Sequence, residues 1–349
     1  MSVSHERSRP GAAAEGAGQG ARATRPQPSE ETPCPLCGHR EYLLVSTIDR
    51  RGAPLRTVMC DACGLVWTNP RPADADVDRY YETEYRLDYS RSRTPTRRKL
   101  LRGFLGAAER RAALDRLLAP GARVLDVGCG AGEFVFLLRQ QRFDAAGIEP
   151  GEEYAAFCRD ILKIQVQTAT VERADVAPQS QSLITMFHML EHVADPRRTL
   201  ATIRDWLVPD AGRLVVEVPN VHSLVQAPRH RFHYAHLYNY SVATLGAFGA
   251  AAGLRLVSSH ESADGGNITC VFASRPPGEA VVAAPDLSAN AVQTREILAG
   301  HTTLRHYLNA VPYRRAADKL ARRWQEDRLL ARLPDLQALL AWSASLGRV

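Results

Sequence analysis

The sequence predicts an α/β fold with a doubly wound, mostly parallel sheet, preceded by a small cysteine-rich module and followed by helices. Residues 123–132 are typical of a buried strand that runs through a glycine loop into a helix. Apolar strands follow at 145–148, 183–187 and 212–218, with helical periodicity between them. Two Cys-x-x-Cys-Gly motifs precede this alternating region. Alternation of strands and helices favours helices on both faces of one sheet.

Length and composition indicate more than one unit. The chain has 349 residues and a net charge of +6, with a pI near 9.0. The basic residues are spread along the chain, which permits nucleic-acid binding without requiring it. No signal peptide or membrane-spanning run is apparent, so we expect a cytoplasmic protein with reduced thiols. The predicted units are a disordered tail at 1–31, a zinc ribbon at 32–72, a helical linker or lid at 73–118, a cofactor domain at 119–276 and a C-terminal helical extension at 277–349.

The cysteine pairs predict a structural zinc ion. Cys34 and Cys37 form the first pair, Cys60 and Cys63 form the second, and 22 residues separate the pairs. This spacing is typical of a four-thiolate zinc ribbon, and the glycine after each pair permits the turn that such a site needs. Disulfides are the competing interpretation, but a reducing cytosol disfavours them. Four thiolates leave no open position for catalysis, so the predicted zinc is structural.

The glycine loop predicts a site for an adenosine-containing cofactor. Gly128, Gly130 and Gly132 lack the Cβ atom that would keep a ligand away from the backbone. The helix that follows offers free N–H groups to a carboxylate or phosphate. Glu149 ends the next strand, where its two carboxylate oxygens can accept hydrogen bonds from ribose hydroxyls.

The loop's spacing disfavours a dinucleotide. G-x-G-x-x-G would need glycine at position 133, where this chain has Glu133, a carboxylate that would repel a pyrophosphate. The loop instead resembles the first motif of class I S-adenosylmethionine-dependent methyltransferases. That resemblance is carried by Asp126, Gly128, Cys129, Gly130, Ala131 and Gly132. It implies a seven-stranded Rossmann-like sheet, a loop that wraps the methionine end of S-adenosylmethionine, and a ribose held by Glu149.

Two further segments extend the resemblance to the ubiquinone-type small-molecule methyltransferases. Residues 190–196 read Leu-Glu-His-Val-Ala-Asp-Pro, which is similar to the fourth-strand region of that family. In the family the loop after the third strand meets the adenine. The residues that this implies here are Ala169, Thr170, Val171 and Glu172. His188, at the end of the fourth strand, is expected to lie beneath the cofactor as a core histidine.

His188, Glu191 and His192 also spell H-x-x-E-H, the signature of one class of zinc peptidase. That class presents both histidines from one helix, whereas here the motif spans a strand end and a turn. We therefore reject the peptidase interpretation. His192 lies nearer the expected cleft and is a candidate for substrate contact or for a general base.

A polar and aromatic segment at 229–241 follows the next strand, where open α/β sheets bind substrates. Its His-Leu-Tyr-Asn-Tyr-Ser stretch from His236 resembles a His-Leu-Tyr-x-Phe-Ser segment of these methyltransferases. His236 is the first candidate for substrate contact and His233 the second. The alternative for either residue is a satisfied surface histidine.

The order of cysteine motif, Asn-Pro-Arg-Pro at 69–72 and a tyrosine-rich segment resembles bacterial methyltransferases with an N-terminal zinc ribbon, including those that act on sugars and secondary metabolites. The tyrosines are expected either to line a substrate entrance or to pack a lid. They are Tyr80, Tyr81, Tyr85 and Tyr89. A basic helix is expected within 97–118, an antiparallel strand pair at 254–259 and 268–274, and helices beyond 291 that pack on the core.

The predicted function is methyl transfer from S-adenosylmethionine to a small molecule, such as a sugar, lipid-linked or natural-product intermediate. A sulfonium methyl group is already activated, so the protein must align donor and acceptor and remove a proton. His192 and His236 are the candidates for that base, and His233 is a third candidate catalytic residue. The alternatives are a zinc-ribbon RNA methyltransferase and a noncatalytic cofactor-binding scaffold. The sequence leaves the oligomeric state open.

Overall fold

A computed structural model describes residues 28–72, 94–275 and 286–346 of the chain. The predicted disordered tail lies almost wholly outside the described residues. The four tyrosines of the predicted entrance also lie outside them. Within the described parts no helix is both long and apolar enough to cross a membrane.

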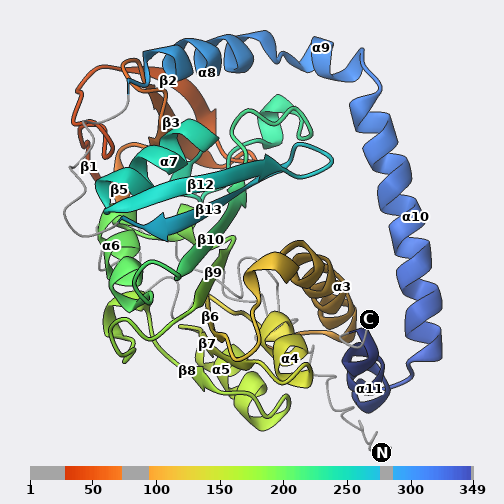
Figure 1. Ribbon diagram of the computed structural model, residues 1–349. Helices are drawn as coiled ribbons and strands as arrows, with labels where there is room; N and C mark the ends of the chain where they lie inside the picture. Colours follow the sequence, from red (N-terminus) through yellow and green to blue (C-terminus); the bar gives the residue numbers. More distant parts are fainter. Residues whose placement is uncertain (1–27, 73–93, 276–285, 347–349) are drawn as a thin grey trace, which may run out of the picture.

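The centre of the molecule is a seven-stranded sheet (Figure 1). In spatial order its strands are β12 (Leu254–Glu261), β13 (Asn267–Ser274), β10 (Arg213–Pro219), β9 (Leu183–Phe187), β6 (Arg123–Val127), β7 (Asp144–Ile148) and β8 (Val166–Gln167). The five neighbouring strands β10, β9, β6, β7 and β8 all run parallel to one another. The strand β13 runs antiparallel to both of its neighbours, β10 and β12. The predicted doubly wound sheet, including its final antiparallel pair, is confirmed.

Helices cover both faces of this sheet. On one face α3 (Arg97–Ala113), α4 (Glu133–Gln140) and α5 (Glu152–Asp160) contribute to a single hydrophobic cluster. On the other face α6 (Pro196–Trp206) and α7 (Val242–Ala251) share a cluster with the ribbon. The central strands are buried on both sides, which explains their continuous apolar sequences.

Capping residues fix where two of these helices begin. The Asp195 side chain accepts a hydrogen bond from the backbone of Arg198, and Pro196 occupies the first turn of α6. Ser241 caps α7 in a reciprocal arrangement with Thr244. Such caps contribute about 1 kcal/mol each to stability and set the entry angle of the chain. Both caps lie immediately after segments that line the functional cavity.

The H-x-x-E-H segment does not form an α-helix. After β9 ends at Phe187, the chain forms one short 3-10 turn, η3 (Leu190–His192), before α6. A zinc-peptidase helix is therefore absent from this described segment.

The cysteine module forms a second, four-stranded sheet. Its strands are β2 (Tyr42–Ile48), β3 (Pro54–Cys60), β4 (Val66–Thr68) and β11 (Tyr238–Asn239), in the order β11-β4-β3-β2. The strand β11 comes from the predicted cofactor domain. The sequence analysis did not predict that a strand of that domain joins the ribbon sheet. The strand β11 pairs antiparallel with β4, through Tyr238 opposite Trp67. The ribbon is thus joined by backbone hydrogen bonds to the segment that holds His236.

Five shorter elements of the described chain lie between or before those already named. They are β1 (Pro28–Glu30), β5 (Arg71–Pro72), η1 (Asp115–Leu117), η2 (Val171–Arg173) and η4 (Pro228–His230).

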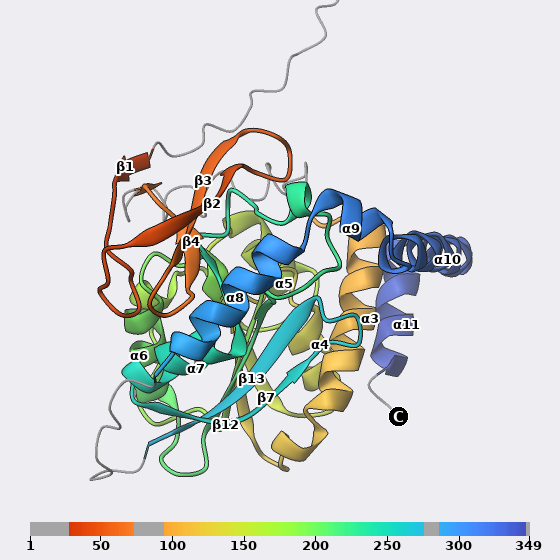
Figure 2. The same cartoon turned by 90° about the horizontal axis from the view of Figure 1, so that it is seen from above.

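Four helices end the described chain: α8 (Ser288–Gly300), α9 (Thr303–Tyr307), α10 (Val311–Arg332) and α11 (Leu336–Leu346). The helix α8 packs beside the ribbon, where Asn290 Nδ2 donates to the Cys63 carbonyl at 2.7 Å. The helix α10 runs along the side of the molecule and α11 packs near α3 and α4 (Figures 1 and 2). Glu326 of α10 is buried between Arg98 and Arg102 of α3. The extension therefore spans from the ribbon to the first helix of the central domain.

Candidate active site

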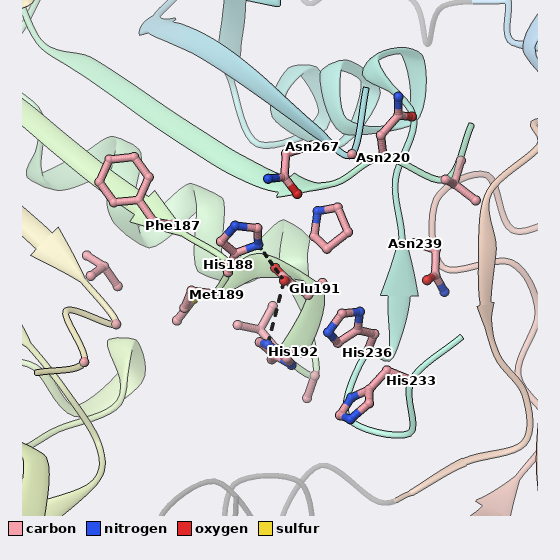
Figure 3. Close-up of a pocket in the computed structure, with 18 of the residues that line it drawn as sticks. Phe187, His188, Met189, Glu191, His192, Asn220, His233, His236, Asn239 and Asn267 are labelled. Atoms are coloured by element: carbon pink, nitrogen blue, oxygen red, sulfur yellow. Dashed lines mark ion pairs between the residues drawn. The ribbon is translucent and has the colours of Figure 1, made fainter. Parts of the chain in front are cut away.

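One cavity of about 680 Å³ opens at the carboxyl ends of β6, β7, β9 and β10. This edge is where open α/β sheets bind ligands. The glycine loop and Glu149 line one end of the cavity, and His192, His233 and His236 line the other. Figure 3 shows the histidines turned toward a common space, with Asn220, Asn239 and Asn267 around it.

The glycine loop approaches the cavity closely because its backbone adopts positive φ angles. The φ angles of Gly128, Gly130 and Gly132 are 75°, 59° and 79°. A Cβ atom at Gly128 would lie 2.9 Å from the Met189 side chain, so a larger residue would displace the wall of the cavity. The backbone N–H groups of Gly128 and Cys129 both donate to the Ile148 carbonyl.

Glu149 ties this loop to the next one. Its carboxylate is buried, with Oε2 accepting from the Gly130 N–H at 2.9 Å and Oε1 from the Gly151 N–H at 3.1 Å. A carboxylate oxygen can accept more than one hydrogen bond, so these backbone contacts do not by themselves prevent Glu149 from accepting from a hydroxyl group. The predicted ribose contact therefore remains compatible with the geometry, and Glu149 additionally fixes the loop.

The predicted cofactor residues fall into two groups. Those that line the cavity are Gly128, Gly130, Glu149, Thr170, Val171, Glu172 and His188. Asp126, Cys129 and Gly132 do not line the cavity. The Thr185 hydroxyl donates to Asp126 at 2.7 Å, and burial raises the pKa of Asp126 to about 7. Cys129 packs so tightly under the loop that a Cβ at Gly147 would lie 2.5 Å from its Sγ.

His188 is held by two carboxylates. Its Nε2 lies 3.1 Å from Glu217 Oε1, and its Nδ1 lies 3.6 Å from Glu191 Oε1. Glu217 also accepts from Arg110 at 2.6 Å. Burial opposes a charge on His188, but the two carboxylates outweigh it and raise the pKa of His188 to about 9. Burial similarly opposes ionisation of Glu217, yet His188 and Arg110 lower the pKa of Glu217 to about 2. No local pattern in the sequence indicates this ion-pair network, because Arg110 is about 80 or more residues from His188 and Glu217 along the chain.

Three histidine rings stack edge to face at the other end of the cavity. The ring centroid of His236 lies 4.9 Å from that of His192 and 5.0 Å from that of His233. His192 Nδ1 lies 2.8 Å from the Ala235 carbonyl, and its Nε2 lies 3.7 Å from Glu191 Oε1. His233 Nδ1 accepts from the Ala235 N–H at 3.1 Å. The structure therefore brings the three predicted catalytic histidines together.

The protonation of His236 follows from its surroundings. Burial first, and then the nearby His192, His233, Arg50 and His188, hold the pKa of His236 well below its ordinary value. His236 is consequently neutral at physiological pH and retains a lone pair on one ring nitrogen.

Glu191 lies among these rings without a hydrogen-bond partner. Its side chain is 1% exposed, and neither oxygen accepts a hydrogen bond from a described residue, although Oε1 lies within ion-pair distance of His188 and His192. The donor atoms of Glu191, His192 and His236 lie within 4.8 Å of one another, a spacing and ligand set that a divalent cation can also use. The H-x-x-E-H motif pairs His188 with His192, whereas the observed cluster pairs His192 with His236.

The four cysteines of the ribbon fit a zinc ion. Cys34 and Cys63 sulfurs lie 3.5 Å apart, Cys37 and Cys60 sulfurs lie 3.6 Å apart, and all four lie within 4.8 Å. Tetrahedral zinc with bonds of about 2.3 Å places its sulfur ligands about 3.8 Å apart. The predicted four-thiolate arrangement is therefore present.

Several cavity residues escaped the sequence analysis. They are Arg50, Asn220, Asn267 and Arg315, whereas Arg231 and Asn239, which also line the cavity, belong to the polar segment predicted at 229–241. Arg50 lies between β2 and β3, and Arg315 lies in α10. Asn220 directly follows β10, and this position at a strand end was the available signal. No comparable sequence pattern indicates that Arg50 or Arg315 lies at the cavity.

The central part of the chain is similar in sequence to known methyltransferases. Residues 98–259 match a protein family described as "Methyltransferase domain". The chain is 32% identical over 106 residues to ubiquinone biosynthesis O-methyltransferase of Aeromonas salmonicida (strain A449), covering 29% of this chain and 44% of that protein. It is 32% identical over 93 residues to the enzyme of the same name from Hahella chejuensis (strain KCTC 2396). This match covers 25% of this chain and 39% of that protein. The chain thus spans less than half of the length of these relatives.

Among solved structures, an S-adenosylmethionine-dependent methyltransferase from Mesorhizobium loti has 19% identity and a TM-score of 0.41, covering 48% of this chain and 99% of that one. The motif residues, the seven-stranded sheet and the family match together identify the central part of the molecule. The chain contains, over residues 98–259, a domain of the class I S-adenosylmethionine-dependent methyltransferase family.

Proposed function

We propose that this protein transfers the methyl group of S-adenosylmethionine to a small-molecule acceptor. One observation carries the proposal: the family's glycine loop and Glu149 share a single cavity with three clustered histidines. A donor at the first end and an acceptor at the second would meet in that cavity, which satisfies the alignment that methyl transfer requires.

The chain's own residues support binding of the donor. When bound, the cofactor supplies an activated sulfonium methyl group. Gly128 and Gly130 leave room for its methionine end, and Glu149 is placed to accept from its ribose while holding the loop. Thr170, Val171 and Glu172 line the same end and are proposed to surround the adenine.

His236 is our candidate for the general base. It is neutral, lines the cavity and has a ring nitrogen able to accept a proton from the acceptor. His192 is a weaker candidate because both of its nitrogens face protein acceptors, Ala235 and Glu191. In neutral His233, Nδ1 accepts from the backbone, so Nε2 carries the proton and acts as a donor.

The proposed acceptor is a sugar, lipid-linked or natural-product intermediate. The relatives named above are enzymes of ubiquinone biosynthesis, which supports an acceptor of small size without defining it.

The direct test is transfer of a labelled methyl group. Wild-type protein and a Glu149→Ala control would be incubated with methyl-labelled S-adenosylmethionine and a lysate of the source cell, and the products separated by class. We expect wild-type-dependent label in the small-molecule or lipid fraction. Label in RNA would instead favour the zinc-ribbon RNA methyltransferase. Tight binding of S-adenosylhomocysteine without label in any fraction, across lysates and purified acceptors, would favour a noncatalytic scaffold.

A further inference from the structure

We infer that the acceptor end of the cavity contains a binding subsite for a phosphoryl group, anchored by Arg231. The assignment of this subsite to the acceptor rests on the function proposed above. The subsite itself rests on three guanidinium groups that the ribbon, the central domain and the C-terminal extension bring to one cavity: Arg50, Arg231 and Arg315.

Arg231 is a largely buried cation without a carboxylate partner. Its Nη1 donates to the Val221 carbonyl at 3.0 Å, and its Nη2 donates to His301 Nδ1. No ion pair joins it to any acidic group in the described parts of the chain. Burial alone lowers the pKa of Arg231, to about 10, and no neighbouring carboxylate offsets this. Burying a cation in this way is costly unless an anion completes the site.

The partners of Arg231 orient it without neutralising it. Because Arg231 donates to His301 Nδ1, His301 carries its proton on Nε2, which lies 3.1 Å from His306 Nδ1. Burial, and then Arg231 and His306, lower the pKa of His301 to about 4. The pKa of His306 is also lowered, mainly by burial. His301 therefore contacts the Arg231 guanidinium directly, and His306 supports His301. Both imidazoles are neutral, so the positive charge of Arg231 is left to interact with a ligand.

Arg50 reaches the cavity from the ribbon, and Arg315 reaches it from the C-terminal extension. The backbone N–H of Arg50 donates to the Phe232 carbonyl at 2.7 Å, which places the hairpin between β2 and β3 beside Arg231. Arg315 of α10 donates through Nη1 to Gln226 and to the Val225 carbonyl. Asp264 is the acid that faces Arg315, and its own oxygen is engaged by Ser262 and Gly266. The three guanidinium groups outnumber Asp264 and Glu191, the two acidic groups of the described chain that are placed at this end.

This chemistry fits a phosphate or diphosphate better than a neutral acceptor. Guanidinium groups bind phosphoryl oxygens through paired, charge-assisted hydrogen bonds, and several arginines can share one multiply charged group. A phosphorylated acceptor bound here would share the cavity with His233 and His236, with its reactive part facing the donor end.

The test is a calorimetric titration of the full-length, zinc-loaded protein, saturated with S-adenosylhomocysteine, using inorganic pyrophosphate as the probe. We expect saturable binding that Arg231→Gln weakens at least about tenfold, since charged hydrogen bonds contribute about 1.5–3 kcal/mol. Arg229→Gln is the matched control, because Arg229 is exposed and does not line the cavity, and should leave binding unchanged. S-adenosylhomocysteine affinity and the melting temperature report whether each variant is folded.

Four outcomes would decide against the subsite or separate it from the proposed function. Wild-type protein that binds S-adenosylhomocysteine but not pyrophosphate would overturn the subsite and leave methyl transfer standing. Malonate binding as tightly as pyrophosphate would overturn its phosphoryl selectivity. Failure to bind S-adenosylhomocysteine would overturn the proposed function, and pyrophosphate titration of the cofactor-free protein would still test the subsite. Should Arg231→Gln not fold, Arg50→Gln combined with Arg315→Gln must weaken pyrophosphate binding, and unchanged binding would overturn the proposal.

Discussion

The two ends of the cavity are built in different ways. Short backbone segments of the central domain, at 127–130, 148–150 and 169–172, form the cofactor end. The acceptor end is assembled from side chains that three distant parts of the chain contribute, such as Arg50, His236 and Arg315. A binding site made of backbone segments is appropriate for a cofactor that many enzymes share. A site made of side chains from added modules is appropriate for a ligand that is specific to one enzyme. Damage to the added modules should therefore affect the acceptor end first.

Removal of zinc is expected to have the largest effect and to separate the two ends. Cys60→Ser should reduce bound zinc from about one ion per chain to near zero, because four thiolates hold it and structural zinc contributes much of the stability of such modules. Since β11 pairs with the ribbon strand β4, the segment that carries His236 should lose its order. We expect methyl transfer to fall to background while the Kd for S-adenosylhomocysteine changes less than about tenfold.

Metal analysis with a matched cysteine variant controls this experiment. Cys270→Ala removes a buried thiol of β13 and should retain the zinc. Equal loss of cofactor binding and transfer in Cys60→Ser would contradict the proposed independence of the two ends. A second metal equivalent that disappears in Glu191→Gln would show that Glu191, His192 and His236 hold an ion.

Loss of the candidate base should be the next largest effect. His236→Gln removes the proton acceptor while keeping a polar side chain, so we expect the rate of transfer to fall about 10²- to 10⁴-fold. The Kd for S-adenosylhomocysteine should remain unchanged, because His236 lies at the acceptor end. His230→Gln is a suitable comparison, since His230 lines the cavity outside the stacked trio of rings. A wild-type rate in His236→Gln would remove this residue from the mechanism.

At the cofactor end, Glu149→Ala should weaken S-adenosylhomocysteine binding about 30-fold or more. The substitution leaves the Gly130 and Gly151 N–H groups without their buried carboxylate and removes the proposed ribose acceptor. Glu152→Ala, at an exposed position three residues away, should bind normally in the same calorimetric titration. An unchanged Kd in Glu149→Ala would overturn the placement of the cofactor.

The cofactor end could be predicted from the sequence because its determinants are local. A buried strand, a glycine loop and a carboxylate one strand later follow one another within 30 residues, and each has a physical reason for its residue type. The four cysteines were equally predictable, because metal ligation requires particular residues at short spacing. The caps at Asp195 and Ser241 likewise follow from local hydrogen bonding.

The acceptor end could not be predicted in the same way. His236 was found through a resemblance, but its proximity to His192 depends on the path of the chain after β10. The pairing of β11 with the ribbon involves two residues, too few for a periodic pattern. The approach of Arg315 depends on how α10 packs along α3, through contacts such as Arg98 with Glu326 that are more than 200 residues apart. Long-range packing, and not local propensity, sets this half of the site.

The smallest predicted effect tests the ion-pair network that lies between the two ends. His188 has its pKa raised to about 9 in the folded protein, above its ordinary value near 6.5, so its pairing with Glu191 and Glu217 stabilises the fold fully below about pH 6.5. This stabilisation should be lost as the pH rises through about 9. Because the imidazole is partly exposed, solvent screening limits the expected contribution to about 1 kcal/mol or less. Wild-type melting temperature should therefore fall about 2–4 °C more between pH 6.5 and 9.5 than that of His188→Gln. Parallel pH profiles for the two proteins would show that the network does not stabilise the fold.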